Sequence, residues 1–263
     1  MQTGFSNLAL RIAVTIFFGP ALLALFWFGG LPHLVGMILV VALGTREYCH
    51  LQTRRGFRAY ASAGMLAASG WCTAAYFYGP ARPELILIGA VVGVAVFSRR
   101  TGEMEGARTT LRGVVYVGYL GSFALLVRDL GGSEITALVL FGIWATDIFA
   151  FFSGRRFGRR HPFPRLSPRK TDAGFVGGMV GALMICAGGA LYFDLLRPGS
   201  ALVLGVLVGA GGLAGDLAES KLKRDAGVKD SSRLIPGHGG VLDRFDSFLF
   251  VYPLVFLFLL VGA

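Results

Sequence analysis

Long apolar runs separated by short charged segments dominate this chain and limit what it can fold into. A helix needs roughly 17 to 25 largely apolar residues to cross the hydrocarbon core of a membrane. About nine runs approach this length, although two of them are short. They lie at 11–29, 31–46, 60–79, 84–98, 111–127, 133–153, 174–196, 200–218 and 245–262.

Composition supports the same conclusion. Of the 263 residues, 54% are hydrophobic and only 15% are charged, and the mean hydropathy is +0.65. Such values exclude an ordinary soluble domain. We therefore predict an all-α, polytopic integral membrane protein with about nine transmembrane helices and basic cytoplasmic loops.

Lysine and arginine are distributed unevenly among the connections between the runs. Positive residues of short loops are retained on the cytoplasmic side of a membrane. Only Arg82, Arg128 and Arg197 of the 25 basic residues fall in one set of connections, and the rest fall in the other set or at the start of the first run. We therefore expect the basic loops and the N-terminus to face the cytoplasm, and the C-terminus to lie outside.

Glycine pairs four residues apart recur within the apolar runs, and small residues let transmembrane helices approach closely. We interpret them as packing notches. No linker or low-complexity segment divides the chain, so we predict one transmembrane catalytic domain over 1–263, with variable helices in about 1–130 and a catalytic half in about 131–263. The pairs are Gly89 and Gly93, Gly177 and Gly181, Gly205 and Gly209, and Gly211 and Gly215.

Polar residues cluster densely between the last two apolar runs. If the eighth run stays helical to its end, Asp216, Glu219, Ser220 and Lys223 recur at helical spacing and share one face. Charged groups near a bilayer are costly unless they face water, a metal or each other. A stripe of two acids, a hydroxyl and an amine therefore indicates a functional site.

A turn follows this stripe and precedes the last run. Its proline and glycines leave backbone N–H groups available, and such a loop can hold phosphate. Asp243 and Asp246 then stand three apart at the start of the last run, with Arg244 between them. Carboxylates of this kind hold magnesium through a few contacts while substrate phosphates complete its coordination. The turn contains Pro236, Gly237, His238, Gly239 and Gly240.

Each of these features has an ordinary structural explanation when taken alone. An aspartate near a helix end is usually a cap, and a charge-rich loop is usually a solvated surface. Together, however, two separated acid pairs, a glycine turn and several cations describe a metal-assisted site for phosphoryl or nucleotidyl transfer.

The segment from Ser220 to Asp246 also resembles the signature of the phosphatidate cytidylyltransferases, or CDP-diacylglycerol synthases, at every fixed position. The resemblance extends upstream to Asp147 and to 154–178, where a Ser-Pro-x-Lys-Thr element stands. The family usually has a glutamate soon after this element, where this chain has Ala173. The matching residues are Ser220, Lys223, Arg224, Lys229, Asp230, Pro236, His238, Gly239, Gly240, Asp243, Arg244, Phe245 and Asp246, with Ser167, Pro168, Lys170 and Thr171 upstream.

The resemblance implies transfer of a cytidylyl group from CTP to phosphatidic acid, giving CDP-diacylglycerol and pyrophosphate with a divalent metal, Mg2+. It implies that Asp216 and Asp243 are metal ligands and that Asp246 is an additional ligand or supports them. Lys223 and Lys229 complete the catalytic set.

Other residues would bind substrate by the same resemblance. His238 either contacts phosphate or braces the turn, and Asp147 either faces the cavity or pairs with an arginine. The substrate-binding candidates are Lys170, Thr171, Ser220, Arg224, His238, Gly239, Gly240 and Arg244.

Three other functions stay open on the sequence: a catalytically altered relative, another CTP-dependent membrane lipid transferase or kinase, and a transporter. The transporter is disfavoured because the ionisable residues gather at one surface and do not continue through the spans. We expect a multi-pass protein of the inner (plasma) membrane, in contact with membrane lipids and without a nucleic-acid partner. Whether K+ assists Mg2+, and whether the chain forms a homodimer, is left open.

Overall fold

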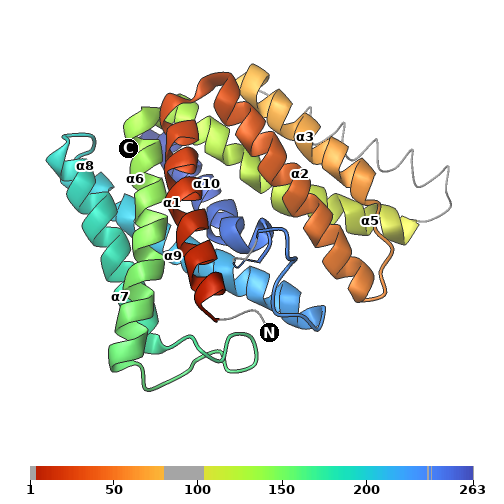
Figure 1. Ribbon diagram of the computed structural model, residues 1–263. Coiled ribbons are helices and arrows are strands. Elements are labelled where there is room, and N and C mark those ends of the chain that lie inside the picture. Colours follow the sequence, from red (N-terminus) through yellow and green to blue (C-terminus); the bar gives the residue numbers. More distant parts are fainter. Residues whose placement is uncertain (1–3, 80–103, 236, 238, 263) are drawn as a thin grey trace. The chain divides into compact units, whose positions relative to one another are not determined.

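The computed structural model describes the backbone of residues 4–79, 104–235, 237 and 239–262, and side chains from residue 16 onward (Figure 1). Every regular element in these residues is helical, and the strand-like pairing found among them is an isolated bridge between Ile235 and Gly239. The predicted all-α class is therefore confirmed.

Five helical stretches in the described residues are long and apolar enough to cross a bilayer. Two of them consist of several helical segments that follow one another without an intervening residue. These are α5, η2 and α6 in one case, and α7, η3 and α8 in the other. A polytopic membrane protein is thus confirmed, whereas the count of about nine spans is not. The five are α2 (Gly30–Arg54), α5 (Met104–Gly113) with η2 (Val114–Tyr119) and α6 (Leu120–Phe157), α7 (Asp172–Ala182) with η3 (Leu183–Ala187) and α8 (Gly188–Tyr192), α9 (Pro198–Asp225), and α10 (Leu242–Gly262).

The longest stretch, Met104–Phe157, contains 54 residues. At the rise of an α-helix this is about 80 Å, more than twice the thickness of a hydrocarbon core. Gly132 interrupts it with φ 74° and ψ −174°, a backbone conformation that glycine adopts without steric cost. The predicted spans 111–127 and 133–153 fall on opposite sides of this break.

Three other predicted spans have different outcomes. The run 11–29 forms most of α1 (Gly4–Phe28), and the run 60–79 forms α3 (Ala61–Tyr78), but neither helix is among the five. The run 84–98 lies outside the described residues.

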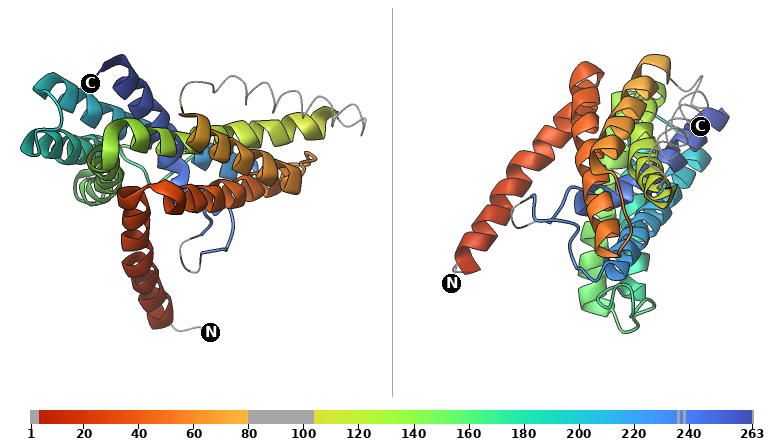
Figure 2. Two further views of the ribbon diagram at one scale, coloured as in Figure 1. Left: turned by 90° about the horizontal axis from the view of Figure 1, so that it is seen from above. Right: turned by 90° about the vertical axis from the view of Figure 1, so that its right-hand side faces the viewer.

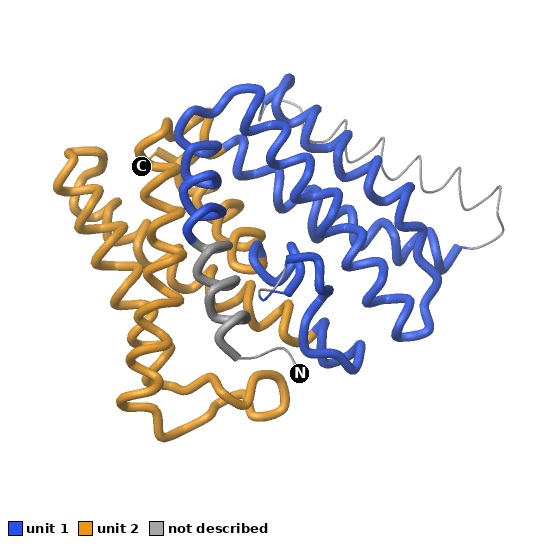
Figure 3. Tube along the Cα trace, in the orientation of Figure 1, with its two compact units in different colours: residues 1–126, 222–245 blue, residues 127–221, 246–263 orange. Residues whose placement is uncertain are grey.

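Two compact units make up the chain, and each combines segments that are distant in sequence (Figure 3). Unit 1 contains residues 1–126 and 222–245, and unit 2 contains residues 127–221 and 246–263. The signature segment is therefore divided between the units, most of it belonging to unit 1. The expectation that the chain acts as one catalytic domain stays a prediction.

Small residues set the packing of unit 1, where α2 and α3 lie side by side (Figures 1 and 2). A Cβ added to Gly118 of η2 would lie 2.7 Å from the Cβ of Ala68 on α3, and one added to Gly44 of α2 would lie 2.9 Å from Val117. Real Cβ atoms do not approach so closely, so these helices need glycine at both positions.

The predicted glycine notches of unit 2 are confirmed as close contacts. A Cβ on Gly205 would lie 2.9 Å from the Cα of Leu183, and one on Gly209 would lie 2.7 Å from the sulfur of Met179. At Gly215 the added atom would collide with the backbone carbonyl of Asp246. Gly89 and Gly93 lie outside the described residues.

Candidate functional site

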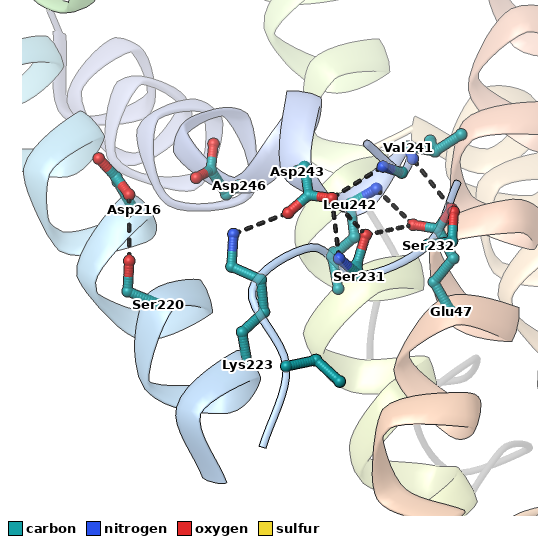
Figure 4. Close-up of polar contacts among 12 residues, drawn as sticks. Glu47, Asp216, Ser220, Lys223, Ser231, Ser232, Val241, Leu242, Asp243 and Asp246 are labelled. Atoms are coloured by element: carbon teal, nitrogen blue, oxygen red, sulfur yellow. Dashed lines mark hydrogen bonds and ion pairs between the residues drawn. The ribbon is translucent and has the colours of Figure 1, made fainter. Parts of the chain in front are cut away.

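The predicted site residues form two groups, one in each unit. Asp243, Lys223 and the glycine turn belong to unit 1, whereas Asp216 and Lys170 belong to unit 2. Figure 4 shows residues of both groups and their polar contacts.

In unit 1, the Asp243 carboxylate organises the loop that precedes α10. Its Oδ2 accepts hydrogen bonds from the backbone N–H groups of Ser231 (2.9 Å) and Gly240 (2.7 Å) and lies 2.8 Å from the Ser231 hydroxyl. Its Oδ1 accepts a 2.7 Å hydrogen bond from Nζ of Lys223, and only 6% of the Asp243 side chain is exposed. One carboxylate thus connects the middle of the loop, the end of the loop and the last turn of α9.

A second carboxylate, that of Glu47 on α2, holds the same loop from the other side. Its Oε2 accepts a hydrogen bond from the backbone N–H of Leu242 (2.8 Å), and its Oε1 accepts one from Val241 (3.0 Å). The hydroxyl of Ser232 donates to Oε1 at 2.6 Å, and that of Ser231 lies 3.0 Å from Oε2. Glu47 is 5% exposed. It accepts hydrogen bonds from backbone donors at the start of α10, which have no backbone acceptor within the helix.

Sequence reasoning missed Glu47, because it follows the predicted span 31–46 and lies far from the signature. One signal was available. Glu47 is the only acidic residue among the first 83 positions. A lone carboxylate at the end of a transmembrane helix is costly unless it is paired or hydrogen-bonded, which made a specific contact the better expectation.

The consecutive glycines of the signature are required by these carboxylates. A Cβ on Gly240 would lie 2.5 and 2.6 Å from the two Glu47 oxygens, and it would also overlap the Ser231 hydroxyl. Gly239 has φ +86°, and a Cβ there would lie 2.6 Å from Oδ2 of Asp243. Only glycine lets the backbone approach both acids this closely.

The remaining predicted residues of unit 1 have more exposed positions. Nη1 of Arg224 donates to the carbonyl of Val228 at 3.2 Å. Lys229 and Arg244 are exposed. Gly237 has φ 76°, as its place in the turn requires. His238 lies outside the described residues.

Unit 2 contains a cavity of about 680 Å³, larger than those of unit 1 described below. It is lined by α6, the loop that follows it, α7 and α9. Four cationic or ionisable nitrogen side chains and two carboxylates reach it, an arrangement suited to an anionic ligand. They are Arg155, His161, Arg169 and Lys170, with Asp147 and Asp216.

Asp216 and Lys170 form an ion pair within this cavity. The Asp216 side chain is 35% exposed, and the hydroxyl of Ser220 donates to its Oδ1 over a long 3.4 Å. The hydroxyl of Thr171 accepts a 3.1 Å hydrogen bond from the backbone N–H of Gly174 and so caps α7. The predicted pair Lys170 and Thr171 therefore lies beside the predicted aspartate.

Asp246 and Ala173 also belong to unit 2. Oδ1 of Asp246 accepts a hydrogen bond from the backbone N–H of Ser247 at 2.6 Å, and Asp246 does not line the cavity. Ala173, where the family usually has glutamate, donates its backbone N–H to Asp172 at 2.7 Å in the first turn of α7.

The carboxylates of both units differ in how well they could hold Mg2+. No cluster of three or more histidine, cysteine, aspartate or glutamate side chains forms a metal cage in the part of the chain that the structure describes. Magnesium does not need one, because one or two carboxylates and substrate phosphates suffice. Asp216 and Asp147, which line one cavity, fit this requirement, with the metal taking the place of Lys170 at Asp216. Asp243 fits less simply, because three donors surround its Oδ2 and Lys223 binds its Oδ1.

Comparison with known proteins gives a consistent result. The model of the Cytidylyltransferase family matches residues 9–261. The chain is 36% identical over 259 residues to a phosphatidate cytidylyltransferase of Brucella abortus, covering 96% of this chain and 93% of that protein. It is 33% identical over 265 residues to one of Synechocystis (88% and 89% covered), and 42% identical over 148 residues to one of Bacillus subtilis (55% of each).

Proposed function

Because this chain belongs to the Cytidylyltransferase family, we propose that it is a phosphatidate cytidylyltransferase, which transfers CMP from CTP to phosphatidate. The products are CDP-diacylglycerol and pyrophosphate. The observation that carries this proposal is the family match over residues 9–261, together with relatives of that name aligned over most of the chain. The hydrogen-bonded signature loop supports it.

The reaction needs positioning and charge neutralisation more than a base. An oxygen of the phosphatidate phosphate forms a bond to the α-phosphorus of CTP while the bond from that phosphorus to the bridging oxygen breaks, and pyrophosphate leaves with those electrons. The attacking phosphate is already anionic at neutral pH. Cations near the reacting phosphates therefore supply the main catalytic effect.

We assign the triphosphate of CTP to the cavity of unit 2. Arg155, Arg169 and Lys170 line it and supply positive charge, and Asp216 lies among them. Asp216 would hold Mg2+, with Asp147 as the second carboxylate of the same cavity. The bound metal would neutralise charge on the phosphates. Lys170, which pairs with Asp216 in the structure, is placed to transfer its contact to a phosphate.

We propose that the first role of Asp243 is to position the signature loop and Lys223. It holds the signature loop through Ser231 and Gly240 and orients the Lys223 ammonium. The family resemblance makes Asp243 and Asp246 metal ligands as well, and for Asp243 this requires Oδ1, the oxygen that Lys223 now contacts. Arg224, Lys229 and Arg244 remain candidates for holding substrate phosphates.

We also propose the membrane in which the protein lies and the side that its site faces. The basic loops indicate a multi-pass protein of the inner membrane whose site faces the cytoplasm, where CTP is available. A homodimer and an assisting K+ ion remain compatible with this function.

The test is pyrophosphate release from purified protein in detergent with CTP, phosphatidate and Mg2+. We expect release to need all three components, and to fall at least 100-fold in Asp216→Ala and Asp243→Ala, on the scale of removing a transition-state contact. Asp129→Asn, at an exposed position of α6, is the matched control. Absence of release from folded wild-type protein would instead indicate a catalytically altered relative or a different acceptor, and Ala173→Glu would be the first variant to test for restored activity.

A further inference from the structure

Unit 1 contains two adjoining cavities of opposite character, and neither includes the carboxylates assigned above to catalysis. One has a volume of about 210 Å³ and the other about 380 Å³. Leu43 lines both, and the consecutive residues Leu234 and Ile235 line one each. The two cavities therefore share a wall.

The smaller cavity is almost entirely apolar. Residues of α1, α2 and the signature segment line it, and among the described residues that do so His33 alone has an ionisable side chain. Among the others are Phe18, Leu25, Phe26, Val40 and Phe245. A cavity with this lining offers a favourable environment to a hydrocarbon chain and none to a nucleotide.

The larger cavity has a mixed lining, with more polar surface than the smaller one, and it carries positive charge. Arg46 and Arg233 line it together with Ser231 and Ser232. Within the described part of the chain Glu47 is the only acid that lines it, and four donors of the protein already surround that carboxylate. The two arginines outnumber this one carboxylate, so the cavity lining carries a net positive charge that can attract an anion, and guanidinium matches phosphate oxygens in geometry.

The order of the two cavities follows from one helix. Gly36, Val40, Leu43, Glu47 and His50 recur at intervals of three or four along α2 and so lie on one face. The first three line the apolar cavity, and the last three line the polar one. One face of α2 thus passes from apolar to cationic, as a ligand with an anionic head and a hydrocarbon tail would require.

We propose that unit 1 binds the phosphatidate substrate here, with its phosphate at Arg46 and Arg233 and a segment of one acyl chain in the apolar cavity. This inference rests on the proposed function and assigns one of its substrates to a location. Ser231 connects the location to the signature, because its hydroxyl lies 3.0 Å from Glu47 and 2.8 Å from Asp243. CTP lacks the hydrocarbon that the second cavity would accept.

The first experiment removes the positive charge. In Arg46→Gln/Arg233→Gln, the KM for phosphatidate is expected to rise about tenfold, since the two exposed arginines each contribute a modest contact to an anion. The KM for CTP stays unchanged. Arg108→Gln, an exposed arginine of α5 that lines neither cavity, is the matched control and leaves both constants unchanged.

The second experiment fills the apolar cavity. Val40→Phe is expected to raise the KM for dioleoyl phosphatidate several-fold more than the KM for dihexanoyl phosphatidate, because only the long chain needs the filled space. Val35→Phe, at an exposed position of α2 outside the cavity, is the control and affects the two lipids alike.

Direct binding separates this inference from the proposed function. Calorimetry without CTP should show that dihexanoyl phosphatidate binds wild-type protein and binds the double arginine variant about tenfold more weakly, whether or not pyrophosphate is released. A rise in the KM for CTP, or unchanged constants in the folded double variant, would each overturn the inference.

Discussion

The carboxylate of Glu47 accepts a 2.8 Å hydrogen bond from the backbone N–H of Leu242, joining residues that are 195 positions apart (Figure 4). Leu242 is the first residue of α10, so an acid from α2 caps the helix that carries Asp243. The N-terminal half, which was predicted to contain the variable helices, thereby holds the signature loop in place.

We expect Glu47→Ala to lower the stability of unit 1 by about 1–3 kcal/mol or more, because it leaves buried donors without their acceptor. Glu47→Gln retains one acceptor oxygen and should lose less. Thermal unfolding in detergent, measured beside pyrophosphate release, tests this. Glu105→Gln, an exposed acid of α5, is the control. Equal stability of Glu47→Ala and wild type would contradict the capping role.

Lys223 and Asp243 should behave as a coupled pair. Their side chains are 14% and 6% exposed, and removal of one member leaves the other charge poorly solvated. We expect Lys223→Met and Asp243→Asn each to destabilise the protein by about 2–4 kcal/mol, and the double variant to be less destabilised than the sum of the two. A double-mutant cycle of unfolding free energies measures this coupling. Strict additivity would show that the ion pair contributes nothing.

Alanine variants of Gly240 and Gly227 would separate two costs of adding a methyl group: steric overlap with neighbouring atoms and backbone strain. At Gly227, φ is +68° and nothing lies within 4 Å of an added Cβ, so Gly227→Ala should cost about 1–2 kcal/mol through its backbone conformation alone. Gly240→Ala places a methyl group against Glu47 and Ser231, and should cost more and reduce activity. Unfolding and turnover of both variants provide the measurement. A Gly240→Ala protein as active as wild type would rule out the tight contact.

The cavity of unit 2 predicts separate effects on CTP. Lys170→Met removes a cation from that cavity and is expected to raise the KM for CTP about tenfold or more, while the KM for phosphatidate stays within twofold of wild type. Arg159→Gln, an exposed residue of the same basic loop outside the cavity, should leave both unchanged. Steady-state kinetics with each substrate varied in turn would show the difference, and a rise confined to phosphatidate would reverse the assignment.

Much of the helical architecture could be predicted from the sequence, because the length and spacing of apolar runs depend on local composition. Gly132 is an example of such a local signal. The interval between the predicted spans 111–127 and 133–153 includes the residue at which the long helix breaks. The division into two units was not foreseen, since residues 222–245 join unit 1 through contacts with distant segments.

The candidate site could be predicted in part for the same reason. Asp243, Lys223 and the glycine turn stand close in sequence, and they also lie together in unit 1. Lys170 and Asp216, 46 positions apart, were linked by resemblance and form an ion pair in the structure. Glu47 has no neighbour in sequence that reveals its hydrogen bonds.

Hydropathy and motif spacing are properties of contiguous residues, and they suffice to identify a helical membrane protein of the cytidylyltransferase family. Three further features became visible only in the folded chain: Glu47 caps α10, Lys223 pairs with Asp243, and an apolar cavity adjoins a cationic one in unit 1. A buried carboxylate must be hydrogen-bonded, and it accepts from the backbone N–H groups that packing places within reach. Packing brings together residues that are far apart along the chain.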